Sequence, residues 1–229
     1  MAFMAQISSA SLATIHSQGG FRYRLTREDV LWMARMAVHE GGRPADTLWT
    51  LTQRMVWFAE KGTNYSSLGA LAQAFSQPIN PKWARDGLFC KPGGQYHGSS
   101  YCTEAKLARR DAARSATFSE LADNNPDVVA VVALWAQGML RNTAPRATNF
   151  SVPRVADAYL EKKPSAAILF TKGNTFIAEP EARAWPEDYV FMEAVTGAIA
   201  NASSVEMPPA RVALARGAAE GLLGWWRLL

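Results

Sequence analysis

The chain has 229 residues, of which 48% are hydrophobic and 19% charged, and 24 Lys and Arg against 20 Asp and Glu give a net charge of +4. These values are typical of a folded globular protein and exclude a disordered or low-complexity chain. The positive charges form no long basic run, so the sequence gives no support for dedicated nucleic-acid binding.

The N-terminal segment, residues 1–25, is rich in Ser, Gly and Ala and shows no clear hydrophobic period, so we expect an extended or mobile arm. The first twenty residues contain no Lys or Arg and are too polar for the apolar core of a signal peptide, so no export signal is predicted. The sequence contains no run of 18 apolar residues, and a membrane-spanning helix is not expected.

Three helices are expected after this arm. The first covers residues 26–42, opens with a capping box between Thr26 and Asp29, and ends at two glycines. The second covers residues 46–61, where apolar residues recur with helical spacing, and the third is a short helix within residues 66–78.

Residues 79–102 contain several Pro and Gly residues and no period, which predicts a long surface loop. The two cysteines of the chain, Cys90 and Cys102, lie in this loop, where they would form a bracing disulfide or remain free thiols. With His97 they would form a C-x6-H-x4-C pattern that matches no standard zinc site. We therefore predict no metal site and no cofactor.

The second half of the chain is again mostly helical. Helices are expected at residues 103–121 and 126–141, and two β-prone runs around Lys-Gly-Asn predict a hairpin at 166–179. Two further helices are expected at 187–203 and 209–228. The predicted fold class is mostly α (α+β) with one small β-hairpin and extra C-terminal helices.

These elements predict an arm at residues 1–25, a central domain at 26–186 and a C-terminal helical attachment region at 187–229. The last region carries Trp225 and Trp226 among several leucines, a composition that suits a helix at a membrane surface. The alternative is a helix that packs on the domain itself or on a neighbouring protein.

Glu40 is the unusual residue of the first helix, because helical spacing places it on the apolar side, between Met33 and Met36. There its carboxyl group would be partly removed from water and would lie near the negative end of the helix dipole, and both effects favour the neutral form. A glutamate protonated near neutral pH is what general-acid cleavage of a glycosidic bond requires. The alternative is a glutamate that bends out to solvent or pairs with Arg43 or Arg54.

Four short segments of the chain, spread over about residues 28–178, have a recognisable order. They are "AR" at 34–35 with Glu40 and Pro44, "QRMV" at 53–56, "QAFS" at 73–76, and Gly138 followed by "RATNFSVP" at 146–153. In this order they resemble the spore-cortex-lytic-enzyme type of cell wall hydrolase, a branch of the lysozyme-like fold that cleaves peptidoglycan. A hairpin follows the last segment in both.

This resemblance implies a lysozyme-like domain with Glu40 as the catalytic acid. It also implies a glycan-binding cleft lined by Gln73, Ser76, Thr148, Asn149 and Phe150. Asn149 stands where a histidine is common in the family, so the chain departs from the pattern there. Two aromatic residues of the predicted loop, Trp83 and Tyr96, are further candidates for stacking on sugar rings.

Many glycosidases also need a second carboxylate, roughly 5–9.5 Å from the first. Asp46 and Asp86 are available, but Asp46 is better explained as a helix N-cap and Asp86 as a solvated loop residue. The lack of a clear partner favours a lytic transglycosylase. In such an enzyme Glu40 would act first as acid and then as base, while the 6-hydroxyl of the sugar closes an anhydro ring.

We therefore expect peptidoglycan glycan strands as the substrate. Without a signal peptide, such an enzyme needs release by lysis or delivery in a particle, which suits a bacteriophage protein held in the virion or host cytoplasm before it acts in the periplasm or cell wall. Two alternatives stay open. One is a non-catalytic virion or envelope protein that binds glycan or a partner, and the other is a peptidase that uses Cys90 and His97 to cut the stem peptide.

Overall fold

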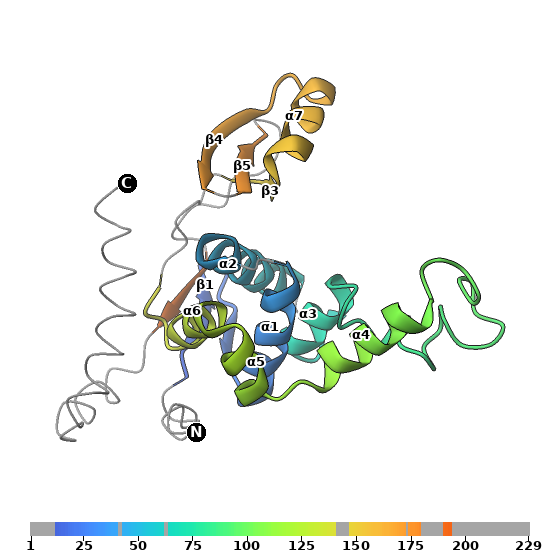
Figure 1. The fold of residues 1–229 in the computed structure, drawn as a ribbon. Coiled ribbons are helices and arrows are strands. Elements are labelled where there is room, and N and C mark those ends of the chain that lie inside the picture. The colour runs from blue at the N-terminus through green and yellow to red at the C-terminus, as the bar shows by residue number, and fades with distance from the viewer. Residues whose placement is uncertain are drawn as a thin grey trace. The chain divides into compact units, whose positions relative to one another are not determined.

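The computed structural model describes residues 12–40, 43–61, 64–140, 147–172, 174–179 and 190–193. Its described helices are α1 (Arg27–Glu40), α2 (Pro44–Lys61), α3 (Leu68–Phe75), the 3₁₀ helix η4 (Pro81–Trp83), α4 (Glu104–Ser115), α5 (Phe118–Asn124), α6 (Pro126–Ala136) and α7 (Pro153–Lys162) (Figure 1). Its described strands are β1 (Thr14–Ser17), β2 (Arg22–Arg24), β3 (Asn149–Ser151), β4 (Ala167–Lys172), β5 (Asn174–Ala178) and β6 (Val190–Glu193). The predicted class, mostly α (α+β), is confirmed.

The main core is built around α1, which packs against α2, α3, α5 and α6 (Figure 1). Apolar residues at helical spacing on α1, such as Met33 and Met36, are fully buried, as are Leu51 of α2 and Leu71 of α3. Burying each such side chain contributes roughly 1.5–3 kcal/mol, so this cluster is the main source of stability for the helical part.

Asp29 connects three elements at the start of α1. The predicted capping box is confirmed, because the backbone N–H of Asp29 donates to the Thr26 hydroxyl and that of Thr26 donates to Asp29. The same carboxylate accepts a 2.9 Å bond from the Tyr23 hydroxyl of β2 and a 2.8 Å bond from the backbone N–H of Gly69 in α3. Burial of the Tyr23 hydroxyl, together with the charge of Asp29, raises the pKa of Tyr23.

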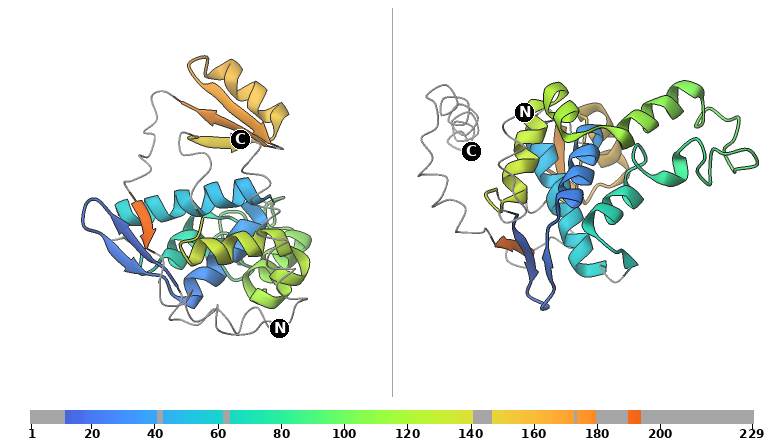
Figure 2. Two further views of the ribbon diagram at one scale, coloured as in Figure 1. Left: turned by 90° about the vertical axis from the view of Figure 1, so that its left-hand side faces the viewer. Right: turned by 90° about the horizontal axis from the view of Figure 1, so that it is seen from below.

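The first sheet corrects the predicted N-terminal arm. Its strand order is β2-β1-β6, and Ile15 of β1 lies opposite Tyr23 of β2 on one side and Met192 of β6 on the other (Figure 2). Leu12, Ala13 and Ile15 are fully buried, so the expectation of an arm is wrong for residues 12–25. These strands were not predicted because they are short and lie in a Ser- and Gly-rich stretch. The turn between them contains Gly20 at a φ of 84°.

The expected helix at 187–203 is wrong at residues 190–193, which form β6. Because β6 pairs with β1, segments from both sides of the predicted central domain belong to one sheet. The chain divides after residue 194 instead, into residues 1–194 and 195–229. The predicted helix at 209–228 lies outside the described residues. Among the residues that are described, no helix is both long and apolar enough to cross a membrane.

The second sheet contains the predicted hairpin, which is confirmed as β4 and β5, with strand order β3-β5-β4. Phe150 of β3 lies opposite Phe176 of β5. Helix α7, which the sequence reading did not identify, contacts β3 and β5, and its Ala156 is fully buried (Figure 1). Trp49 of α2 joins this sheet to the helices, because its indole N–H donates a 3.1 Å bond to the carbonyl oxygen of Ala147.

Two helix boundaries differ from the prediction. The helix expected at 103–121 is two helices, α4 and α5, because Thr117 begins α5 with a capping box to Glu120. Helix α6 begins at Pro126 as predicted but ends at Ala136 rather than near residue 141. Gly138, with a φ of 72°, follows its end and marks a left-handed turn that a continuing helix would not contain.

Candidate active site

Glu40 is the last residue of α1, and Ser76 follows the last residue of α3. The Ser76 hydroxyl is fully buried and donates a 2.8 Å hydrogen bond to Oε1 of Glu40, although the two residues are 36 positions apart in sequence. The fold therefore brings together two of the residues that the sequence assigned to a glycan-cleaving site. The bond fixes one carboxylate oxygen of Glu40 in position.

Glu40 itself is exposed, so the expected partial burial of its carboxyl group is wrong. Exposure increases along the last turn of α1, from Ala37, which is fully buried, through Val38 and His39, which are half-buried. Helical spacing gives the side of the helix on which a residue lies but not where the packing ends along the helix axis. The alternative of a glutamate that reaches solvent at the helix end therefore describes the exposure correctly.

Arg54 of α2 is a positive group whose charge interacts with that of Glu40. It is buried, donates a 3.3 Å bond to the carbonyl oxygen of Phe75, and stacks on Trp57 with its Cζ 4.7 Å from the ring centre. Burial lowers the pKa of Arg54, and the charge of Glu40 acts in the opposite direction. The Nε atom of Arg54 is buried and has no hydrogen-bond partner among the described residues.

Arg109 of α4 is a second positive group whose charge acts on the end of α1. Burial lowers the pKa of the half-buried His39, the charge of Arg109 in α4 lowers it further, and the charge of Glu40 acts in the opposite direction. Arg109 is exposed, so α4 presents a cation to solvent beside this helix end.

The α3 segment of the site contains Gln73 and an aromatic residue that the sequence reading missed. The amide of Gln73 donates a 3.3 Å bond to the carbonyl oxygen of Gly69 in its own helix. Phe75 is 43% exposed and contacts Trp57 and Tyr65, with ring centres 5.1 and 6.0 Å apart. It lies inside the "QAFS" segment, so its position was available from the sequence. An exposed ring next to Ser76 is a surface on which a sugar could stack.

The predicted cleft residues of β3 lie in the second sheet. Thr148 bonds the carbonyl oxygen of Ile177 through its backbone N–H at 2.8 Å and its hydroxyl at 3.1 Å. Phe150 packs between Trp49 and Phe176, with ring centres 5.3 and 5.5 Å apart, so its main contacts are with this sheet's own core.

Asn149 of β3 lies beside the carboxylate of Glu179. Its Nδ2 lies 3.5 Å from a carboxylate oxygen of Glu179, which also accepts a hydrogen bond from the Tyr159 hydroxyl. Its own Oδ1 is buried without a partner among the described residues. Glu179 was not predicted as a site residue, although it is the last residue of the segment predicted to form the hairpin.

The loop that carries Trp83 and Tyr96 is closed by a disulfide between Cys90 and Cys102. The two rings stack on each other, with centres 5.0 Å apart and planes 22° apart, and the guanidinium of Arg110 lies 5.1 Å from the Trp83 ring centre. Their contacts are therefore mainly within the loop. Their role in sugar binding stays a prediction.

The disulfide decides between the alternatives left open for the cysteines. Both sulfurs are bonded, so Cys90 is not available as the nucleophile of a Cys/His peptidase. Within the described part of the chain, no group of His, Cys, Asp and Glu side chains is arranged to hold a metal ion.

Asp46 differs from the N-cap that the sequence suggested. Helix α2 begins at Pro44, and the backbone N–H of Thr47 donates to the carbonyl oxygen of Arg43, so Asp46 lies inside the first turn. Its side chain is fully buried and accepts a 2.5 Å bond from Asn174 of β5. Burial raises the pKa of Asp46 to about 6, against the lowering effects of Asn174 and Arg43.

Of the two candidate second carboxylates, Asp46 is 0% exposed and is therefore closed to a substrate. Asp86 is exposed and lies shortly before Cys90, the first cysteine of the disulfide. The geometry leaves Glu40 as the exposed carboxylate that is bonded to a predicted cleft residue.

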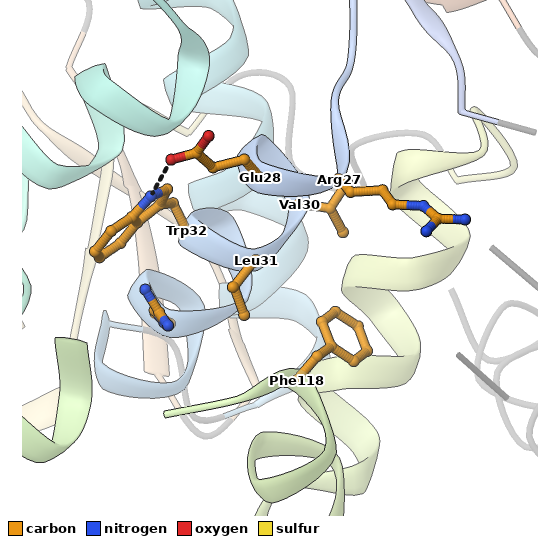
Figure 3. Close-up of a pocket in the computed structure, with 7 residues that line it drawn as sticks. Arg27, Glu28, Val30, Leu31, Trp32 and Phe118 are labelled. Atoms are coloured by element: carbon orange, nitrogen blue, oxygen red, sulfur yellow. Dashed lines mark hydrogen bonds between the residues drawn. The ribbon is translucent and has the colours of Figure 1, made fainter. Parts of the chain in front are cut away.

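A pocket of about 430 Å³ lies farther back along α1, between its first half and α5 (Figure 3). Trp32 forms one wall, with its indole N–H donating to Glu28 at 3.4 Å and Arg35 4.3 Å from its ring centre. Arg35 is held by a 2.9 Å bond from its Nε to the carbonyl oxygen of Ala116. This pocket does not include Glu40, and its lining is mostly apolar.

A scan against protein-family models, a search of curated proteins and a search of solved structures each found no match.

Proposed function

We propose that the protein cleaves the glycan strand of peptidoglycan as a lytic transglycosylase, with a lysozyme-like domain and with Glu40 as acid and then base. The observation that carries the proposal is the hydrogen bond between Glu40 and Ser76. It joins an exposed carboxyl group at a helix end to a buried hydroxyl from another helix, and both residues belong to the segments that resemble a cell wall hydrolase. An acid that is accessible and held in place satisfies the first geometric requirement of general-acid catalysis.

In the proposed reaction Glu40 gives its proton to the glycosidic oxygen as the bond from that oxygen to C1 of N-acetylmuramic acid breaks. The carboxylate that remains then takes the proton of the sugar's own 6-hydroxyl. The 6-oxygen attacks C1 and closes the 1,6-anhydro ring, so no water is consumed. A bound sugar would exclude water from Glu40, and this favours the neutral acid at the start of the cycle.

Arg54 supports the second half of this cycle. Its charge interacts with that of Glu40, so it stabilises the carboxylate that forms after proton transfer. The 2.8 Å bond from Ser76 acts in the same direction, because a hydroxyl donor favours the charged form of its acceptor. These two groups would offset part of the free-energy cost of a negative charge in a site covered by glycan.

The disulfide supports action outside a reducing cytoplasm, because such bonds persist in oxidising compartments such as the periplasm. We place the enzyme in a bacteriophage virion, or in the host cytoplasm before release at lysis, with its activity in the periplasm or cell wall. Residues 187–229 would attach it to virion proteins or to a membrane surface. Because β6 lies within this range, we place the attachment in the part after residue 194.

The proposal is tested by digesting purified peptidoglycan and identifying the products by mass spectrometry. Wild-type protein should release muropeptides with 1,6-anhydro-muramic ends, and Glu40→Gln should release almost none. Glu161→Gln, which changes an exposed glutamate of α7, is the matched control and should behave as wild type. Products with reducing ends would identify a hydrolase instead, and cleaved stem peptides would contradict glycan cleavage.

One observation favours a second candidate, a non-catalytic virion or envelope protein that binds glycan. Glu40 is exposed and lies near a buried arginine, which is a favourable setting for a carboxylate that accepts hydrogen bonds from sugar hydroxyls. In this case wild-type protein would sediment with peptidoglycan and release no muropeptides over long incubation.

A further inference from the structure

The positive charge of the chain is concentrated in one segment, residues 79–115. This segment contains seven Lys and Arg residues and three Asp and Glu residues, a net charge of +4 that equals the net charge of the whole chain. The rest of the sequence is therefore balanced. The seven cations are Lys82, Arg85, Lys91, Lys106, Arg109, Arg110 and Arg114.

The part of this segment before α4 contains only the short helix η4 among its described elements, yet several contacts hold it in a defined shape. Cys90 and Cys102 close the loop, and four aromatic rings pack inside it with neighbouring centres 4.8–6.1 Å apart. Arg110 is buried beneath them and donates a 3.3 Å bond to the carbonyl oxygen of Trp83, which ties the loop to α4. The loop and α4 project beyond the neighbouring helices in Figures 1 and 2.

Four cations of the segment are exposed and form no ion pair among the described residues, and one of them, Lys106, donates a 2.6 Å bond to the carbonyl oxygen of Ser100. Arg85 forms ion pairs at 2.7 Å with Glu104 and at 3.8 Å with Asp111. Lys82, Lys91 and Arg109 are exposed and form no ion pair within the described ranges of the chain. Two large apolar side chains of the same segment are also exposed, Leu88 at 55% and Tyr101 at 50%.

Lys82, Lys91 and Arg109 belong to the segment that follows the candidate active site in the chain. The chain leaves Ser76 through Ile79, which is fully buried in the main core, and reaches the loop with Asn80 bonded at 2.9 Å to the carbonyl oxygen of Ala74. At the other side Arg109 is close enough to α1 for its charge to act on His39, the neighbour of Glu40. The segment is therefore tied to α3 through Asn80 and lies near the end of α1 through Arg109.

We propose that Lys82, Lys91 and Arg109 form a docking surface for the carboxylates of peptidoglycan stem peptides, which holds the glycan strand while Glu40 cleaves it. The choice of polymer rests on the proposed function. Stem peptides branch from the strand at regular intervals and carry free carboxylates, so they present repeated negative charges along a polymer. Single exposed ion pairs are weak, but several made by one rigid surface on one polymer act together.

The test uses Glu40→Gln protein, which does not destroy its target, in cosedimentation with peptidoglycan sacculi from which covalently attached phosphate polymers have been removed. Adding Lys82→Gln, Lys91→Gln and Arg109→Gln should weaken binding at least about tenfold and remove most of its salt dependence. The control is the charge-matched set Arg22→Gln, Arg154→Gln and Lys162→Gln, three exposed cations of β2 and α7, which should bind as before.

A second measurement leaves the protein unchanged. Chemical amidation of the stem-peptide carboxylates should weaken the binding of the Glu40→Gln protein by a similar factor. Equal binding by the two variant sets, or unchanged binding to amidated sacculi, would overturn the proposal. So would binding that disappears when the phosphate polymers are removed, or tighter binding to a double-stranded DNA probe than to sacculi.

These outcomes are separate from those of the catalytic proposal. Salt-dependent binding with no muropeptide release would leave the docking surface in place and remove the enzyme. Release of anhydro-muropeptides by a protein whose binding ignores all three cations would do the reverse.

Discussion

Glu40 and Asp46 are six positions apart in sequence, yet the fold gives them opposite surroundings. Glu40 is exposed at the end of α1 and accepts a hydrogen bond from Ser76. Asp46 is fully buried in the first turn of α2, where burial raises its pKa to about 6. The residue expected to be a desolvated acid is open to solvent, and the residue expected to be a helix N-cap is enclosed.

The comparison separates two properties that are often read together at an active site. A raised pKa makes a carboxyl group able to hold a proton near neutral pH, but only access allows it to give that proton to a substrate. Asp46 has the first property without the second, and its bond to Asn174 indicates a structural role between α2 and the second sheet. Glu40 has access and would gain desolvation only when glycan covers it.

The largest expected effect distinguishes the two carboxyl groups by activity. Glu40→Gln keeps the acceptor for Ser76 but removes the proton donor, so peptidoglycan cleavage should fall by roughly 10²–10⁴-fold. Asp46→Asn, which keeps the size of a buried side chain that no substrate can reach, should leave the rate within a few-fold of wild type. Initial rates of muropeptide release by folded proteins measure both. Equal losses in the two variants would break the distinction.

The second effect concerns the pH dependence of stability. The pKa of Asp46 is raised from an ordinary value of 3.8 to about 6 in the folded protein. The unfolded chain therefore releases this proton at lower pH, and the free energy of unfolding should fall as pH rises from about 4 to about 6, by up to about 3 kcal/mol. Urea denaturation of wild type and Asp46→Asn at several pH values measures this.

Asp46→Asn carries no titrating group at this position. Its free energy of unfolding should therefore fall less than that of wild type as pH rises from about 4 to about 6. The difference between the two curves is the relevant quantity, because other carboxylates titrate in both proteins. Parallel curves between pH 4 and 7 would show that Asp46 does not hold its proton in the fold.

The smallest effect concerns the hydrogen bond that positions Glu40. Ser76→Ala removes the 2.8 Å bond, and we expect cleavage to fall roughly tenfold, in line with the net contribution of one hydrogen bond. Ser115→Ala, which removes a hydroxyl bonded to the Asp111 carbonyl in α4, is the control and should cleave normally. A wild-type rate for Ser76→Ala would remove Ser76 from the site.

Local sequence signals predicted much of the helical part. The Thr26 and Asp29 capping box, the spacing of apolar residues in α2 and the Lys-Gly-Asn turn of the hairpin each depend on residues close together in the chain. The same kind of signal is present at Thr117 and Glu120, where a second capping box separates α4 from α5. The boundary between these two helices is therefore also encoded locally.

The strands β1 and β6 could not be found in this way. They are four residues each, too short for a clear alternation of apolar and polar residues, and they are stabilised by pairing between Ile15 and Met192. The side chains of His16 and Glu193, which also bond between these strands, are 177 positions apart in sequence. Pairing over such a separation leaves no local pattern in either segment. The predicted arm and the predicted helix at 187–203 failed for this single reason.

The sequence by itself determined the first three helices, the start of α6 and the hairpin, and it supplied the candidate residues of the site, because these follow from local spacing and short motifs. Tertiary structure alone decided which of them meet and which are covered. It joined Glu40 to Ser76, closed Asp46 against Asn174, and turned Trp83 and Tyr96 toward each other. The physical reason is that the exposure of a side chain depends on which other elements pack against it. The period of a helix shows the side on which a residue lies but not where that packing ends.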